Sequence, residues 1–166
     1  MFTLMEKERE VADAPGALPL AIRLLSGAGG QQAGAVDASV RFDHVSFAYD
    51  AARPILHDIS FEIPAGQTVA VVGPSGSGKS TLARLLFRFY DAQTGQISIA
   101  GQDIREVTQS SVRQAIGIVP QDTVLFNDTV EYNIAYGRPG ASRAEVEAAA
   151  RAAHIHDFIV STPKGY

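Results

Sequence analysis

Residues 73–80 constrain this chain more than any other feature, because their sequence GPSGSGKS matches the pattern G-x-x-x-x-G-K-[ST] at every fixed position. The preceding run TVAVV, residues 68–72, is continuously apolar, which is typical of a strand buried on both faces. The following residues, 81–90, have the apolar spacing of an amphipathic helix. A glycine-rich turn between a buried strand and a helix predicts a loop that binds phosphate groups.

Each residue type in this loop has a physical role in holding phosphate. The glycines permit positive φ and a close approach of the backbone to an anion. Backbone N–H groups of the loop converge on the β-phosphate at the positive end of the following helix. Lys79 supplies a cation between the β- and γ-phosphates, and the Ser80 hydroxyl is a hard oxygen ligand suited to Mg²⁺. The predicted nucleotide-binding residues of the loop are Gly73, Ser75, Gly76, Ser77, Gly78, Lys79, Ser80 and Thr81.

Composition narrows the possible partners. The chain has 166 residues, which suits a single domain, and its formal charge is -4, from 14 basic and 18 acidic residues. That balance argues against nucleic acid as a partner, since phosphate backbones are bound by clustered Lys and Arg. The chain has no cysteine, so it forms no disulfide or thiolate metal site. No run reaches the roughly 20 apolar residues that a membrane-spanning helix needs.

Apolar periodicity predicts the remaining elements of an α/β or α+β fold. An early strand starts at Val40 and slips in register at Asp43 and His44, where the alternation of apolar residues is interrupted. Ser142 and Glu145 form a capping box that starts a helix ending near Ala153. Further strands are predicted at residues 59–63, 96–100 and 116–119, and a further helix at residues 111–115.

The N-terminal part of the chain has a different composition. Residues 26–38, SGAGGQQAGAVDA, are rich in Gly, Ala and Gln, which favours a flexible linker. We therefore predict a linker over residues 1–35 and a folded domain with the phosphate-binding loop over residues 36–166.

Several ordered blocks resemble the nucleotide-binding domain of ABC transporters. The blocks are VRFDHVSFAYD (40–50), ILHDISFEIPAGQTVAVVGPSGSGKSTLARLLFRFYDAQTGQISIAGQDI (55–104) and IGIVPQDTVLFNDTVEYNI (116–134). They are most similar to the exporter type, in the branch of Atm-type heavy-metal and glutathione-conjugate exporters, and VADAPGA (11–17) is similar to the linker of that branch. The resemblance implies a P-loop NTPase core with an antiparallel β subdomain, incomplete at its C-terminal side.

The resemblance also implies partners and site residues. ATP with Mg²⁺ would bind between this domain and a second nucleotide-binding domain, and a transmembrane domain would hold both on the cytoplasmic or matrix side of a membrane. Tyr49 matches the aromatic residue that stacks on adenine, and Gln121 matches the glutamine that reaches Mg²⁺ or the attacking water, so Lys79 and Gln121 would act in catalysis. Residues 122–133 would contact the transmembrane domain through Leu125, Phe126 and Tyr132.

Other parts of the family's hydrolytic machinery are not found in these residues. The sequence has no LSGGQ-type signature, no apolar run ending in Asp-Glu and no switch histidine. We therefore expect the chain to be part of a longer protein and to bind ATP without turning it over. We also expect apolar surface of the central sheet to be left unpaired.

Three alternatives compete with this interpretation. A soluble P-loop kinase or GTPase would share the loop but would leave Tyr49 and Gln121 unexplained. An ATP-binding regulatory module without hydrolysis would fit the residues present. A metal site at His154 and His156 is disfavoured, because residues spaced by two diverge on a helix and no third ligand lies nearby.

Arg53 and Ile55 follow Tyr49 and would flank the base or ribose, although Arg53 suits a solvated turn equally well.

Overall fold

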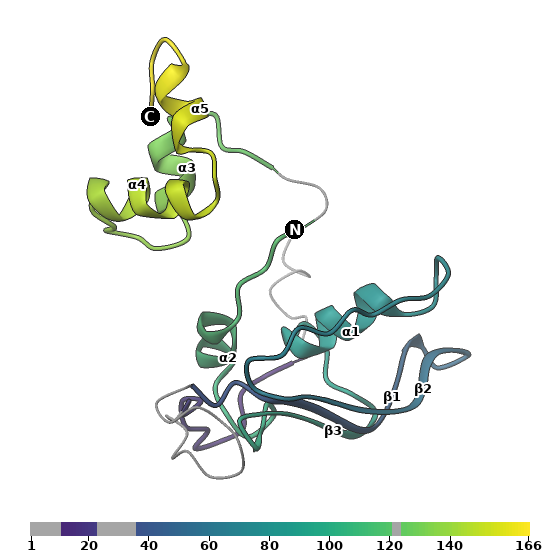
Figure 1. Cartoon of the computed structure of the whole chain (residues 1–166). Coiled ribbons are helices and arrows are strands. Elements are labelled where there is room, and N and C mark those ends of the chain that lie inside the picture. The colour runs from purple at the N-terminus through teal and green to yellow at the C-terminus, as the bar shows by residue number, and fades with distance from the viewer. Residues whose placement is uncertain (1–10, 23–35, 121–123) are drawn as a thin grey trace, which may run out of the picture. The chain divides into compact units, whose positions relative to one another are not determined.

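The computed structural model describes residues 11–22, 36–120 and 124–166. They form two compact units, Met1–Ile118 and Val119–Tyr166. The first unit contains a four-stranded antiparallel sheet with the strand order β2-β1-β3-β4 (Figure 1). The strands are β1 (Val40–Asp50), β2 (Arg53–Ile63), β3 (Thr94–Ile99) and β4 (Gln102–Asp103). The predicted antiparallel sheet is therefore confirmed.

The predicted slip of register in β1 is also present. The pairing of β1 is interrupted between Phe42 and Val45 on the β2 side and between Asp43 and Ser46 on the β3 side. His44, which lies in both gaps, adopts a positive φ of 50°. Gly95 of β3 lies directly against this bulge, so close that a Cβ on Gly95 would lie 2.2 Å from the carbonyl oxygen of His44. In a regular strand, residues three positions apart point to opposite faces of the sheet. The bulge allows Phe42 and Val45 to be buried on the same side.

His44 and Asp58 form an exposed ion pair beside the bulge, with 2.6 Å between Nδ1 and Oδ1. The hydrogen bond to Asp58, and then the negative charges of Asp58 and Asp43, raise the pKa of His44 above its ordinary value of 6.5. Because the folded-state pKa is the higher one, the pair stabilises the fold fully below pH 6.5. That contribution is lost as the pH rises through the folded-state pKa.

We expect the His44 ring to titrate above pH 6.5 in an NMR titration of its imidazole protons, because the imidazolium form donates a hydrogen bond to Asp58. Asp58→Asn removes the negative charge and should return the midpoint toward 6.5. A midpoint that is the same in the wild-type chain and in Asp58→Asn would contradict the pairing.

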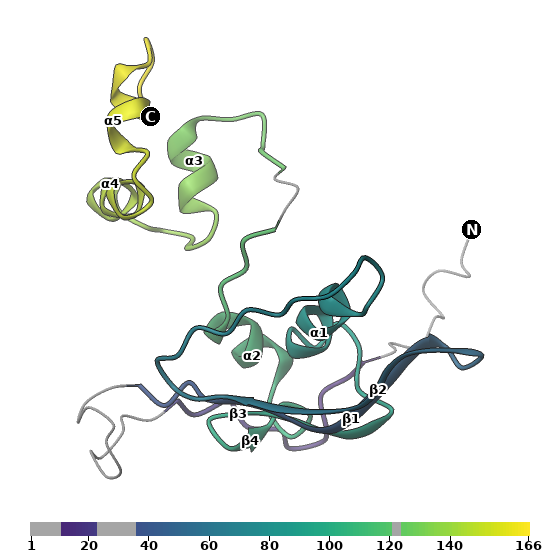
Figure 2. The same cartoon turned by 45° about the vertical axis from the view of Figure 1, so that its right-hand side comes forward.

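The core of the first unit lies between the sheet and two helices on one of its faces (Figure 2). Helix α1 (Lys79–Leu86) contributes Leu85, and helix α2 (Gln109–Ala115) contributes Val112; both side chains are fully buried. They pack with apolar residues of the sheet and of the segment after β4, namely Phe42, Val45, Phe47, Leu56, Ile97, Ile99, Ile104 and Val107. The predicted helix at 111–115 and strand at 96–100 are thus confirmed with small shifts of their ends.

Helix α1 ends earlier than the sequence predicts. Its last residue is Leu86, and Arg88 adopts a left-handed conformation with φ 52°. A helix cannot continue through that conformation, so Phe89 leaves the packed face and is 47% exposed. The prediction of an amphipathic helix that reaches residue 90 is therefore wrong.

Two predicted buried strands are absent from the described residues. Residues 68–72 and 116–119 form no strand, and their valines are exposed, Val72 by 87% and Val119 by 96%. A strand needs neighbours that accept and donate its backbone hydrogen bonds, and no described strand is hydrogen-bonded to either segment. The prediction of a buried strand is wrong for both segments, whereas the expected unpaired apolar surface is observed.

The described residues of the second unit contain the helices α3 (Val130–Ala135), α4 (Arg143–Ala152) and α5 (His156–Ser161). The predicted capping box is confirmed, since Ser142 N donates to Glu145 Oε2 over 2.8 Å and Glu145 N donates to Ser142 Oγ over 3.4 Å. His156 Nδ1 lies 2.7 Å from the hydroxyl of Tyr166. None of the helices in the described parts of the chain has the length and apolar character that crossing a bilayer requires.

Candidate nucleotide-binding site

The glycine-rich loop ends at the N-terminus of α1, as predicted. Gly78 is the N-cap residue and has a φ of 89°, which few residues other than glycine adopt. A Cβ at this position would lie 2.7 Å from Cδ2 of Leu56 and 3.3 Å from Cγ2 of Ile55. Strand β2 therefore packs directly behind the loop and fixes where α1 begins.

Lys79 folds back over the loop. Its Nζ atom donates hydrogen bonds to the carbonyl oxygens of Gly73 and Pro74, each over 2.7 Å, and to Ser77 Oγ over 3.3 Å. A single ammonium group thus closes a ring of residues 73–79. The ring places a positive charge at the N-terminus of the helix, where the helix dipole is also positive.

The N-terminus of α1 is suited to an anion. No side chain caps it, and its first turn contains no acidic residue. The first N–H groups of a helix have no partner within the helix, so they are available to phosphate oxygens. The hydroxyl of Ser80 belongs to an exposed residue of the same turn. It supplies one hard oxygen, which fits Mg²⁺ because this ion keeps several water and phosphate ligands.

Tyr49 lies beside the same helix, at the end of β1. Its hydroxyl donates to Thr81 Oγ1 over 3.4 Å and accepts from Arg84 Nη1 over 3.0 Å. Its ring meets the rings of Phe47 and Tyr90 edge-on, with centroids 4.9 and 5.0 Å away, and 42% of its surface is exposed. Burial raises the pKa of Tyr49, but the hydrogen bonds with Thr81 and Arg84 outweigh it and leave the pKa below 10.0.

The structure brings most of the predicted site residues together. Tyr49 and the loop residues meet at α1, and Ile55 packs behind Gly78. Arg53 is exposed at the start of β2. Gln121 and Asp122 lie outside the described residues. Arg84 was not predicted from the sequence, although its spacing of three from Thr81 on a helix places both residues on one face.

A groove of about 550 Å³ opens beside the loop. Lys79 and Ser77 form its polar end, and the rest is lined mainly by apolar residues of β2 and of residues 69–72. These residues include Phe61 and Val69, which place no polar side chain opposite a nucleotide base. The groove is therefore mainly the unpaired apolar surface of β2 and residues 69–72, with Glu62 as a further polar residue of its lining.

Comparison with known proteins agrees with the geometry. The family model described as ABC transporter matches residues 56–164, which is more than half of the chain. An ATM1-type heavy metal exporter of Novosphingobium aromaticivorans is 58% identical over all 166 residues, which cover 25% of that protein. ATP-binding cassette sub-family B member 6 of Homo sapiens is 54% identical over 166 residues, which cover 18% of it.

A solved structure gives the same result. The fold superimposes with a TM-score of 0.89 on a structure described as a bacterial Atm1-family ABC exporter with ATP bound, at 58% identity over 99% of this chain and 27% of that chain. The fold and the phosphate-binding loop define an ABC-type ATP-binding domain of the P-loop NTPase class.

The chain belongs to the ABC transporter family and corresponds to part of the nucleotide-binding domain of an Atm1-type exporter. It spans about a quarter of the length of the bacterial relatives that it matches. The predicted family and branch are confirmed, and the alternative of a soluble kinase or GTPase is dropped.

Proposed function

We propose that this chain binds ATP together with Mg²⁺, with the phosphates in the loop of residues 73–80 and the adenine on Tyr49. The observation that carries the proposal is the meeting of an uncapped helix N-terminus, the Lys79 ammonium group and the exposed ring of Tyr49 along a single helix. Phosphates and base of one nucleotide would thus contact two ends of a continuous surface.

Lys79 changes partners when phosphate binds. Its hydrogen bonds to the carbonyl oxygens of Gly73 and Pro74 involve uncharged acceptors, whereas phosphate oxygens carry negative charge. Charge-assisted hydrogen bonds are roughly twice as strong as neutral ones, so the exchange favours the bound state. Backbone N–H groups of residues 75–81 would complete the contacts, and Ser80 would hold Mg²⁺.

Tyr49→Ala is expected to weaken ATP binding by about 1–3 kcal/mol, or roughly 5- to 150-fold, because stacking of a base on an aromatic ring contributes that much. Tyr49→Phe keeps the ring and removes the hydroxyl that contacts Thr81 and Arg84, so it should lose much less. Isothermal titration of the wild-type chain and both variants with MgATP distinguishes the two effects. Equal affinity of the wild-type chain and Tyr49→Ala would refute the adenine position.

The second unit supports a proposed contact with a transmembrane domain. Phe126, Tyr132 and Tyr136 form an exposed aromatic cluster, in which Phe126 lies 4.5 Å from Tyr136 and 5.8 Å from Tyr132 between ring centroids. The side chain of Asn133 binds both the N–H and the carbonyl group of Phe126, which fixes this aromatic residue outward. Leu125 is 76% exposed beside them. Rigid exposed aromatic residues are typical of protein interfaces.

We further propose the assembly that the exporter relatives suggest. In it, this domain pairs with a second nucleotide-binding domain and couples ATP binding and hydrolysis to transport, on the cytoplasmic or matrix side of a membrane. Gln121 is proposed to contact Mg²⁺ or the attacking water. The boundary at residue 36 stays a prediction, and the contacts of residues 11–22 described next bear on it.

A further inference from the structure

Residues 11–22, here called the strap, lie along the first unit and are held mainly through their backbone. Thr108 N donates to the carbonyl oxygen of Leu18 over 3.0 Å, and Leu20 N donates to Ser111 Oγ over 2.8 Å. The side-chain amide of Gln102 pairs with both backbone groups of Ala21, over 3.0 and 2.6 Å. The strap is thus bound by β4 and by the start of α2.

Arg88 fastens the other end of the strap. The residue is only 2% exposed, and its guanidinium donates to the carbonyl oxygen of Ala12 over 3.0 Å and to Asp13 Oδ1 over 3.4 Å. The remaining hydrogen bonds go to Val107 O, over 2.8 Å, and to Asp91 Oδ1, over 3.1 Å. If the strap left, this buried cation would lose two of its four partners, and an incompletely paired buried charge is costly.

Gln109 reinforces the same end. Its backbone N–H donates to Asp13 Oδ1 over 2.9 Å, and its side-chain amide donates to the carbonyl oxygen of Val11 over 3.1 Å. The Asp13 carboxylate therefore bridges Arg88 and the first residue of α2.

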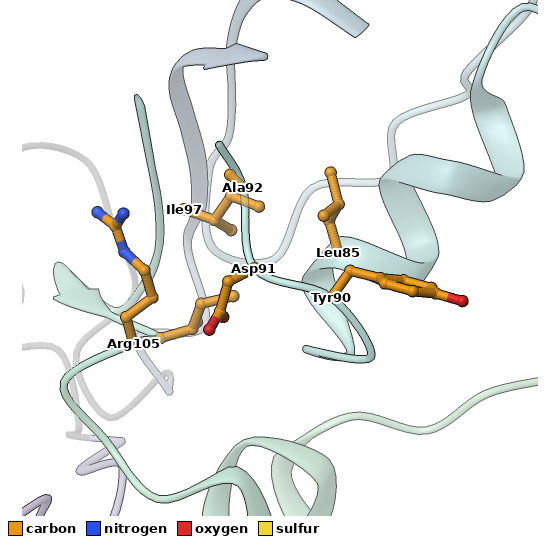
Figure 3. A pocket seen from close by; sticks show the side chains of 7 residues that line it. Leu85, Tyr90, Asp91, Ala92, Ile97 and Arg105 are labelled. Carbon is orange, nitrogen blue, oxygen red and sulfur yellow. The ribbon is translucent and has the colours of Figure 1, made fainter. Parts of the chain in front are cut away.

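Arg88 is also joined firmly to α1. Its backbone N–H donates to the carbonyl oxygen of Leu85 over 2.9 Å, and the carbonyl oxygen of Arg88 accepts a hydrogen bond from Arg113 Nη2 over 3.2 Å. Leu85 lines a small void together with Asp91 and Arg105, which measures about 10 Å³, or room for about one water molecule (Figure 3). The C-terminal end of α1 consequently has little freedom to move without Arg88.

We propose that the strap is a docked part of the ATP-binding domain and that its docking is energetically coupled, through Arg88 and α1, to ATP binding at the opposite end of that helix. This inference rests on the proposed ATP site. Docking fixes Arg88 and, through it, the C-terminal end of α1. Phosphate binding at the N-terminal end of the same helix then loses less conformational entropy when the strap is in place. Coupling between two binding events is reciprocal, so ATP strengthens docking by the same factor.

The test uses the full chain and avoids Arg88, whose loss could unfold the domain. The double variant Gln102→Ala/Gln109→Ala removes contacts to the strap and none to the loop. Gln96→Ala, at an exposed position of β3, is the control. Amide hydrogen exchange of Leu20, Ala21 and Thr108 is measured with and without saturating MgATP, and ATP affinity is measured by titration calorimetry.

We expect MgATP to slow exchange of these amides about fivefold or more in the wild-type chain and in Gln96→Ala. The double variant should exchange faster without nucleotide and bind ATP more weakly by a similar factor. ATP binding that leaves strap exchange unchanged, or a double variant with wild-type affinity, overturns the coupling alone. A wild-type chain that binds no ATP overturns the proposed function and the coupling together.

Discussion

Lys79→Ala is expected to weaken MgATP binding by about 100-fold, which corresponds to about 3 kcal/mol. In the structure Lys79 is the cation that bridges the loop at the helix N-terminus, through hydrogen bonds to Gly73, Pro74 and Ser77. Removing it takes away the side-chain cation and leaves the phosphate charge to backbone N–H groups and Mg²⁺. Titration calorimetry with MgATP measures the loss directly.

Lys164→Ala is the matched control, because it removes the same side chain from an exposed position in the second unit. It should bind ATP as the wild-type chain does. Circular dichroism of both variants separates a lost contact from a lost fold, since Lys79 contacts mainly exposed loop atoms. Equal affinity in Lys79→Ala and Lys164→Ala would refute a phosphate site at residues 73–80.

Gly95→Ala is expected to destabilise the first unit by about 3–5 kcal/mol, the sum of positive-φ strain and of overpacking at the β1 bulge. Gly95 has a φ of +78°, and a Cβ there would lie 2.2 Å from the carbonyl oxygen of His44 and 2.4 Å from that of Asp43. These are backbone atoms of a paired strand, so they cannot move aside without disturbing the pairing of β1 with β3.

Gly101→Ala separates the two contributions. Gly101 has a similar φ of +73°, but no atom lies within 4 Å of where its Cβ would be. It should therefore cost only about 1 kcal/mol, from backbone strain alone. Urea unfolding followed by NMR signals of β1 residues reports on the first unit separately. Similar midpoints for Gly95→Ala and Gly101→Ala would show that the bulge does not contact Gly95 as described.

Features that depend on neighbouring residues were predicted well from the sequence. The capping box of Ser142 and Glu145, the loop at Gly78 and the slip at His44 each depend on residues a few positions apart. Such contacts are determined by local backbone geometry, and the spacing of side chains in the sequence shows it directly. The resemblance to ABC transporters added the position of Tyr49, which spacing alone would not give, since its partner Thr81 lies 32 residues away.

Features that depend on distant partners were missed. The apolar run that ends at Val72 indicates a strand, but burial of a strand depends on which strands lie beside it, and the run itself does not specify them. The early end of α1 depends on the left-handed φ of Arg88. A glycine at this position would have indicated the end of the helix, but the residue is an arginine. The strap was missed because Arg88 and Asp13 are separated by 75 residues. Gln121 lies outside the described residues, so its predicted role stays a prediction.

The ring that Lys79 closes with the carbonyl oxygens of Gly73 and Pro74 gives this loop an internal competitor for its own ligand. The affinity measured for a nucleotide then reflects the energy of the hydrogen bonds from Lys79 to phosphate minus the energy of its hydrogen bonds to the two carbonyl oxygens. It is therefore smaller than the full strength of the phosphate contacts. A ligand with a single weak oxygen would gain little over the carbonyl oxygens it displaces. A polyphosphate offers several charged oxygens and therefore gains much more binding free energy. We expect the closed ring to favour ligands with several negative charges over ligands with one.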